Sequence, residues 1–239
     1  MARHDGRKPG EIRPVSIVTD FICYPEGSVL ISCGNTKVIC NATVEDTVPP
    51  FLKGKGRGWV TAEYNMLPRA TATRTPRDIS KLKLNGRAAE IQRLIGRALR
   101  ACVDMAKLGE RTITIDCDVL QGDGGTRTAS VTGGFVALAL ACRKLMAEGK
   151  VKRDPIVHQV AAVSAGIVDD ALLLDLPYSE DSRAQVDLNC VMNEKGELIE
   201  LQGTGEGRSF TLSEQQELVR LCAKGIAELM EKQRQVLNG

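Results

Sequence analysis

The chain has 239 residues, 43% of them hydrophobic and 26% charged, and a formal net charge of +2, the composition of an ordinary globular protein. Its N-terminal segment lacks the apolar stretch of a signal peptide, and no apolar run approaches the roughly 18 residues that a membrane span needs. We therefore expect a cytoplasmic protein with a large buried core and no membrane partner.

Alternating apolar residues predict four strands before any helix, with a tight hairpin turn at Gly34 and Asn35 between the second and the third. The four strands are expected at residues 14–21, 28–34, 36–46 and 58–64. Because four strands precede the first helix, a regular alternation of strand and helix is not expected in this part of the chain.

Two basic loops and a helix follow these strands. Residues 53–58, KGKGRG, are typical of a mobile basic loop that precedes the fourth strand. Residues 69–77, RATATRTPR, form a second loop, with arginines at Arg69, Arg74 and Arg77. Asn85 is then expected to cap a helix that carries Arg87 in its first turn.

The second part of the chain contains a strand at residues 112–120 and a helix that ends near Gly149. Four more strands are expected at residues 160–168, 171–176, 184–192 and 197–203. The last helix is expected to begin with Ser213 and Gln216 as a capping box.

These elements predict an α+β fold with helices packed on mixed sheets, rather than a doubly wound parallel sheet. No change of composition marks a linker. We expect one domain over residues 1–239, built as two similar strand-then-helix halves that meet near residue 150.

Eight cysteines occur in the sequence, at positions 23, 33, 40, 102, 117, 142, 190 and 222. No CxxC pair is present, and the two histidines, His4 and His158, are too far apart in the sequence for the usual spacing of a zinc site. Most of the cysteines fall in apolar, periodic segments, where a free thiol packs as a small hydrophobic side chain. This pattern favours buried, reduced thiols over metal ligands or disulfides, and hence a reducing compartment.

The charge is distributed unevenly. Residues 53–100 contain twelve Lys and Arg and three acidic residues, a local net charge of +9. This block indicates a polyanionic partner, although an ordinary solvated surface would have the same composition. Aromatic residues make up only 3% of the chain, so that any bound RNA would be held mainly by its phosphates.

The stretch GDGGTRTAS, residues 122–130, lies between a predicted strand and a predicted helix. It lacks the lysine of a P-loop, and Arg127 replaces the third glycine of the GxGxxG pattern. The N–H groups of Gly125, Thr126 and Arg127 and the Arg127 guanidinium fit a small tetrahedral oxyanion, which Arg87 is placed to contact as well. The alternative is an ordinary capped helix in which Arg127 pairs with Asp123.

Two aspartates form a second candidate site. Asp187 points to the polar face of its strand, and Asp181 would be about 20 Å away if the chain between them were extended. The two carboxylates therefore share an ion only if residues 180–182 turn back. Carboxylates without a histidine suit Mg²⁺ or Mn²⁺ rather than zinc. The alternative is that Asp187 is simply exposed to solvent.

Five ordered stretches closely resemble the ribonuclease PH family: GWVTAEYNMLPRAT, GRAAEIQRLIGRALRA, GERTITIDCDVLQGDGGTRTASVTGGFVAL, YSEDSRAQVDLNCVM and ELQGTGEG. The resemblance implies a phosphate-dependent 3′-5′ exoribonuclease that trims 3′ extensions of tRNA precursors and other RNA 3′ ends. Such an enzyme releases nucleoside diphosphates and acts in reverse as a nucleotidyltransferase. The resemblance also implies a duplicated two-layer β-β-β-α-β-α unit, a left-handed crossover and a homohexamer built as a trimer of dimers.

The resemblance also implies roles for single residues. The co-substrate, inorganic phosphate, is assigned to Arg87, Gly125, Thr126 and Arg127, and Mg²⁺ or Mn²⁺ to Asp181 and Asp187. The expected catalytic set is therefore Arg87, Arg127, Asp181 and Asp187. RNA binding is assigned to the loop arginines Arg69, Arg74 and Arg77.

Three other functions remain open at this point. A non-catalytic RNA-binding ring subunit would share the fold, but both arginines and both aspartates of the expected site are present. A hydrolytic exoribonuclease would release monophosphates without added phosphate. A small-molecule phosphotransferase would leave the basic block without a role.

Overall fold

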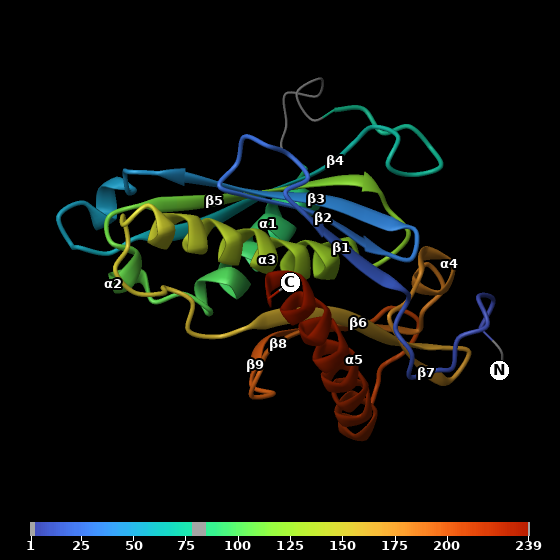
Figure 1. Cartoon of the computed structure of the whole chain (residues 1–239). Helices are drawn as coiled ribbons and strands as arrows, with labels where there is room; N and C mark the ends of the chain where they lie inside the picture. Colours follow the sequence, from blue (N-terminus) through green and yellow to red (C-terminus); the bar gives the residue numbers. More distant parts are fainter. Residues whose placement is uncertain (1–2, 78–84, 239) are drawn as a thin grey trace.

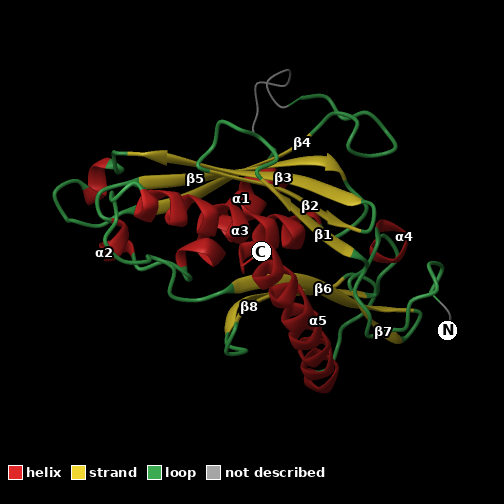
Figure 2. Cartoon of the chain, viewed as in Figure 1, coloured by secondary structure: helices red, strands yellow, loops and turns green. Residues whose placement is uncertain are grey.

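Within residues 3–77 and 85–238, which this computed structural model describes, nine strands form two separate sheets (Figure 2). The strands of the first sheet are β1 (Val15–Thr19), β2 (Gly27–Cys33), β3 (Thr36–Glu45), β4 (Trp59–Met66) and β5 (Thr112–Gln121). Those of the second sheet are β6 (Val160–Val168), β7 (Ala171–Leu174), β8 (Val186–Asn193) and β9 (Leu198–Gly205). Each of the strands predicted from the alternation of apolar residues is present.

The three long helices are expected from the sequence, whereas two short helices of four residues each are not. The helices are α1 (Gly86–Arg100), α2 (Met105–Leu108), α3 (Thr126–Ala147), α4 (Tyr178–Asp181) and α5 (Leu212–Asn238), with a short 3-10 turn at Pro50–Leu52. The predicted cap of α1 is confirmed, because the Asn85 side chain accepts a hydrogen bond from the Arg87 N–H.

The first sheet has the strand order β1-β2-β3-β5-β4. Its strands are antiparallel except β4 and β5, which run parallel and are joined through α1. The carboxyl ends of β4 and β5 therefore meet at one edge of the sheet. The second sheet, in the order β7-β6-β8-β9, is antiparallel throughout, so the expectation of mixed sheets holds only for the first.

Helix α3 lies between the two sheets and contacts β2, β3 and β6 (Figure 1). The expectation that no apolar run is long enough for a membrane span is wrong for this helix. By length and composition alone, its 22 residues are long and apolar enough to cross a membrane. In this structure, however, 78% of its most apolar window is buried. Its hydrophobicity is thus explained by contact with a sheet on either side.

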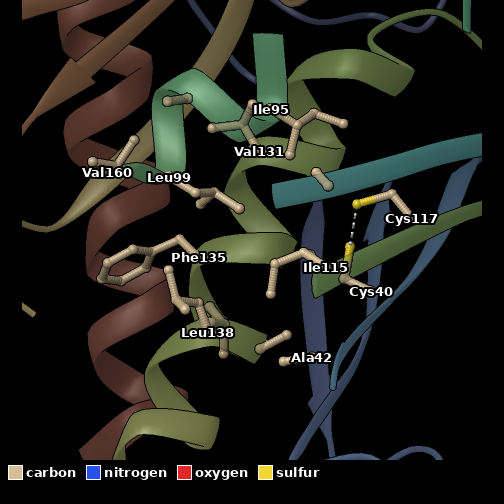
Figure 3. Close-up of a cluster of buried hydrophobic side chains, with 14 of the residues drawn as sticks. Cys40, Ala42, Ile95, Leu99, Ile115, Cys117, Val131, Phe135, Leu138 and Val160 are labelled. Atoms are coloured by element: carbon tan, nitrogen blue, oxygen red, sulfur yellow. Dashed lines mark hydrogen bonds between the residues drawn. The ribbon is translucent and has the colours of Figure 1, made fainter. Parts of the chain in front are cut away.

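The main core forms where α1 and α3 pack against the first sheet. Figure 3 shows Leu99 of α1, Phe135 of α3 and Ile115 of β5 among these side chains, and all three are buried. Cys40 and Cys117, paired across β3 and β5, lie in the same core with their sulfur atoms 3.9 Å apart. The structure contains free cysteines only, and all of them except Cys23 are buried, as the sequence predicts.

A second core lies between the second sheet and α5. Successive residues of β6 alternate between the two cores, so that Val160 and Ala162 join the core around α3 while Ala161 and Val163 join the core around α5. The polar residues of β6 and β8 that share a face with Ala162 are therefore directed toward α3 and the Gly-rich turn.

The predicted start of α5 is wrong. The helix begins at Leu212, and its capping box consists of Thr211 and Glu214 instead of Ser213 and Gln216. The Glu214 N–H donates to the Thr211 hydroxyl at 3.2 Å, and the Thr211 N–H donates to the Glu214 carboxylate at 2.7 Å. Arg208 also binds this carboxylate, and the pKa of Glu214 is lowered to about 2 mainly by that hydrogen bond.

The basic block does not form one surface. Lys53, Lys55 and Arg57 precede β4, whereas residues 69–77 follow it, so the eight residues of β4 separate the two loops. Arg97 binds Glu200, and Arg100 lies over the Trp59 ring and donates to the Val60 carbonyl. Asp78, Lys81 and Lys83 lie outside the described residues. The net charge of the block therefore overstates the size of any single anion-binding surface.

Candidate phosphate-binding active site

The Gly-rich turn connects β5 to α3. Gly124 and Gly125 have φ angles of 72° and 65°, a left-handed conformation that suits glycine. A Cβ atom on Gly124 would come within 2.4 Å of the Leu176 carbonyl oxygen, so the turn also requires a small residue. Gly125 is the N-cap of α3, and no side chain caps the helix. The first N–H groups of α3 thus lack helical acceptors and carry the positive end of the helix dipole.

Arg13 and Asp175 support this turn from behind. The Arg13 guanidinium donates to the Asp123 carbonyl oxygen at 2.5 Å, and to the Asp175 carboxylate at 2.6 and 3.0 Å. Thr36 donates to the Gly124 carbonyl oxygen at 2.7 Å. Burial would raise the pKa of Asp175, but its hydrogen bonds to Arg13 and the charge of Arg13 hold it below the usual value. The carbonyl groups of Asp123 and Gly124 are therefore held in place by Arg13 and Thr36.

Asp123 joins the turn to α4. Its carboxylate accepts a hydrogen bond from the Tyr178 N–H at 3.1 Å and another from the Asn35 side chain at 3.2 Å. The alternative in which Asp123 pairs with Arg127 is therefore wrong. Because Tyr178 begins α4, and α4 ends at Asp181, these contacts fix the Gly-rich turn relative to the first predicted metal ligand.

One cavity of about 240 Å³ contains all the predicted phosphate and metal residues. It is lined by Arg87, Gly125, Thr126, Arg127, Ser164, Asp181, Ser182, Asp187, Asn189 and Glu206. α4 and the turn after it fold the chain back between Asp181 and Asp187, as a shared site requires. Residues from both halves of the chain thus build a single site.

The two arginines enter the cavity from the first turns of α1 and α3. Arg127 donates to the Gln202 side chain at 3.0 Å and lies 3.9 Å from the Glu90 carboxylate. Arg87 is exposed, and its guanidinium forms no ion pair within the described part of the chain. Below them, the Tyr64 hydroxyl is 2.8 Å from the Thr126 hydroxyl. The arrangement presents two guanidinium groups and a helix N-terminus to one small volume.

The two aspartates interact electrostatically across the cavity. Burial raises the pKa of Asp187 to about 6, and the charge of Asp181 adds to this rise. Burial also raises the pKa of Asp181, while the charges of Arg87 and Arg127 oppose the effect. Asn189 donates to the Asp187 carboxylate at 3.0 Å. The alternative that Asp187 is simply exposed to solvent is therefore wrong, because it is only partly exposed and lines the cavity.

The loop with the three predicted RNA-binding arginines borders a second cavity of about 320 Å³. Arg77 lines this cavity, and Arg87 lines both cavities. Arg69 and Arg74 are exposed on the same loop and line neither cavity. The Gly122 N–H donates to the Ala70 carbonyl oxygen at 2.8 Å, which attaches the loop to the Gly-rich turn.

Several residues at or behind the site were not predicted: Arg13, Ser164, Asp175, Gln202 and Glu206. Gln202 and Glu206 lie in the motif ELQGTGEG, so their positions were available from the resemblance but their contacts were not. Arg13 and Asp175 are 162 residues apart and belong to no recognised motif. Ser164 falls in an apolar strand pattern, where a single serine is unremarkable.

Residues 11–144 match domain 1 of the 3′ exoribonuclease family, and residues 158–224 match domain 2. The chain belongs to this family, the ribonuclease PH family. Its relatives include the ribonuclease PH of Bacillus subtilis, which is 60% identical over 99% of this chain and 97% of that protein. The ribonuclease PH of Bacillus pumilus is 61% identical over 98% of this chain and 97% of that protein.

Solved structures share the ribonuclease PH fold at much lower sequence identity. Rice Rrp46 has a TM-score of 0.79 and 16% identity, over 98% of this chain and 100% of that chain. The Archaeoglobus fulgidus exosome with RNA bound to the active site contains a chain with a TM-score of 0.81 and 23% identity, over 96% and 92% of the two chains. The predicted α+β fold is confirmed, while the equivalence of the two halves stays a prediction.

Proposed function

We propose that this chain trims the 3′ ends of tRNA precursors and other RNAs, and that Arg87, Arg127 and the N-terminus of α3 hold the attacking phosphate. The observation that carries the proposal is the single cavity that contains both arginines, the Gly-rich turn and both aspartates. As a member of the ribonuclease PH family, the chain is a phosphorolytic 3′-5′ exoribonuclease and tRNA nucleotidyltransferase. A non-catalytic ring subunit and a hydrolytic nuclease are not favoured.

The chemistry matches the groups that line the cavity. In the reaction, a phosphate oxygen forms a bond to the terminal phosphorus of the RNA while the bond from that phosphorus to the 3′ oxygen of the preceding nucleotide breaks. A nucleoside diphosphate leaves, and the shortened RNA keeps a 3′ hydroxyl after protonation. Phosphate is already anionic near neutral pH, so no strong general base is needed. Catalysis consists of holding two anions together, which the guanidinium groups and helix N-terminus support.

The donor set also fits a divalent cation. Asp181 and Asp187 offer only carboxylate oxygens, and their mutual repulsion in a buried position is the kind that a hard cation relieves. Glu206 also lines the cavity, but within the described residues no three acidic, His or Cys side chains are close enough together to hold a metal ion. Two carboxylates suit Mg²⁺ or Mn²⁺ held together with water and phosphate oxygens. A bound ion would supply positive charge beside the phosphates. We assign its protein ligands to Asp181 and Asp187.

The RNA path and the assembly belong to the same proposal. Because Arg87 lines both cavities, the larger one beside Arg77 is a suitable route for the RNA end. A homohexamer, as a trimer of dimers, is supported by the fold shared with exosome proteins. It is also supported by two exposed apolar side chains, Val18 of the edge strand β1 and Phe21 just after that strand. A cytoplasmic location is supported by the free cysteines, all but one of them buried.

Replacing Arg127 by Ala tests the phosphate assignment. We expect kcat/KM for phosphate to fall about 100-fold or more, because one charged donor to the transferring group is lost. Binding of tRNA should stay within about twofold of the unchanged protein, because phosphate contacts spread over the RNA dominate that affinity. The measurement uses a 3′-extended tRNA precursor with Mg²⁺, with and without phosphate, and identifies the nucleotide released.

A matched control is Arg220→Ala. Arg220 is an exposed arginine of α5 in an ion pair with Glu217, and we expect full activity after its replacement. Nucleoside diphosphates should appear only when phosphate is present. Full activity of the Arg127→Ala protein would contradict the phosphate site, and release of monophosphates without phosphate would indicate hydrolysis.

A further inference from the structure

One buried hydroxyl at the site has no hydrogen-bond partner in the protein. Ser164 of β6 is 4% exposed, and its Oγ atom forms no hydrogen bond. Among the described residues it is the only buried side-chain oxygen or nitrogen atom in this condition. Buried polar atoms are nearly always hydrogen-bonded, so a single exception beside an active site requires an explanation.

Other buried hydroxyls of this chain are bonded. Ser28 accepts from the Ile22 N–H at 2.9 Å and donates to the Asn41 side chain at 2.7 Å. Ser130 donates to the Thr126 carbonyl oxygen at 2.8 Å. Thr132 accepts from the Ala162 N–H at 3.1 Å. The fold therefore satisfies hydroxyl groups in its interior, and Ser164 differs because of its position.

Ser164 lies in the wall of the phosphate cavity. It pairs with Asn189 of β8, which lines the same cavity and is bonded to Asp187. The Ser164 carbonyl oxygen accepts a hydrogen bond from the Asp175 N–H at 2.7 Å. Since Asp175 binds Arg13, and Arg13 binds the Asp123 carbonyl, the backbone of Ser164 is fixed relative to the Gly-rich turn.

The charges of the cavity make a neutral donor valuable. Asp181, Asp187 and Glu206 line it together with two arginines, so its lining has more acidic than basic side chains. A hydroxyl can donate to a phosphate oxygen without adding negative charge. Rotation about χ1 moves a serine Oγ among three staggered positions, so a residue in the wall can turn its hydroxyl toward a ligand.

We propose that the Ser164 hydroxyl donates a hydrogen bond to the tetrahedral oxyanion held by Arg87 and Arg127. Ser164 is then a third side-chain donor to the phosphate co-substrate, located on β6 opposite the two helices. This role rests on the proposed phosphate site and adds a binding residue to it. It would give the buried hydroxyl the hydrogen-bond partner that the protein itself does not provide.

The test compares Ser164→Ala with Ser28→Ala and Arg127→Ala. The melting temperature is measured over a series of inorganic phosphate concentrations, and KM is measured separately for phosphate and for the tRNA precursor. For Ser164→Ala we expect KM for phosphate to rise about five- to tenfold, the effect of one lost hydrogen bond, with KM for RNA unchanged. Without phosphate its melting temperature should equal or exceed that of the unchanged protein, because the variant removes an unsatisfied hydroxyl.

The controls separate the possible results. Ser28→Ala should lower the melting temperature without changing the response to phosphate, because its hydroxyl has partners within the protein. Arg127→Ala should abolish that response. If Arg127→Ala raises KM for phosphate and Ser164→Ala does not, the role of Ser164 is refuted and the phosphate site stands. If neither does, the phosphate site itself is refuted. A loss of stability in Ser164→Ala like that of Ser28→Ala, or a change in KM for RNA alone, also overturns the inference.

Discussion

Asp187 differs from an ordinary surface aspartate because its ionised form is unfavourable in the folded protein. Burial and then the charge of Asp181 raise its pKa from 3.8 to about 6. When the folded state has the higher pKa, it binds a proton more readily than the unfolded state. The stabilising contribution of protonated Asp187 is therefore complete below about pH 4 and is lost as the pH rises through about 6.

In buffer containing EDTA, Asp187→Asn should make the protein more stable than the unchanged chain at pH 7, by up to roughly 3 kcal/mol, and the two should converge near pH 4. Asp181→Asn removes the like charge and should give part of the same gain. The measurement is urea unfolding between pH 4 and pH 7. An equal difference at every pH would mean that Asp187 is not repelled in the folded state.

Helix α5 shows how an element can be recognised while its first residue is not. Two patterns of the capping-box type overlap at this point, Thr211 with Glu214 and Ser213 with Gln216. The apolar periodicity that predicts the helix is compatible with either start. Arg208 decides between them, because it binds the Glu214 carboxylate from the preceding turn. That contact depends on the path of the chain after β9, which the local pattern does not contain.

The two capping boxes make opposite predictions for alanine variants. Thr211→Ala should destabilise the protein by about 1 kcal/mol, because it removes the acceptor for the Glu214 N–H. Ser213→Ala should change stability by less than about 0.5 kcal/mol, because Ser213 is exposed inside the first turn. Both values come from urea unfolding at neutral pH. A larger loss for Ser213→Ala would restore the start that the sequence pattern favours.

Local sequence patterns predict the elements and residues that form the site, but not the contacts that hold these elements together. The strands, the three long helices and the Gly-rich turn follow from periodicity and turn chemistry, and the motifs of the resemblance identify Arg87, Arg127, Asp181 and Asp187. The support of the turn by Arg13 and Asp175 joins residues 162 positions apart, and Asp123 joins the turn to Tyr178. Such contacts depend on how the two sheets pack around α3, so no short stretch of sequence indicates them.

The basic block includes two loops that lie at opposite ends of β4. Its net charge suggests one RNA-binding surface, but β4 spans eight residues, about 25 Å of extended chain, between the two basic loops. Only the loop of Arg69, Arg74 and Arg77 lies at the edge where β5 leads into the Gly-rich turn. The loop of Lys53, Lys55 and Arg57 lies at the far end of β4. Because phosphate contacts act over short distances at physiological salt, the two loops are expected to contribute unequally.

Two triple variants compare these loops at equal charge. Replacing Arg69, Arg74 and Arg77 by Gln should weaken binding of a 3′-extended tRNA and reduce the slope of log K against log salt by about 2, because up to three phosphate contacts are lost. Replacing Lys53, Lys55 and Arg57 by Gln removes the same charge and should leave the slope nearly unchanged. Binding is measured by fluorescence anisotropy from 50 to 300 mM salt, on the order of the range where counterion release dominates. Equal slopes for the two variants would mean that total charge, rather than the loop beside the Gly-rich turn, governs RNA binding.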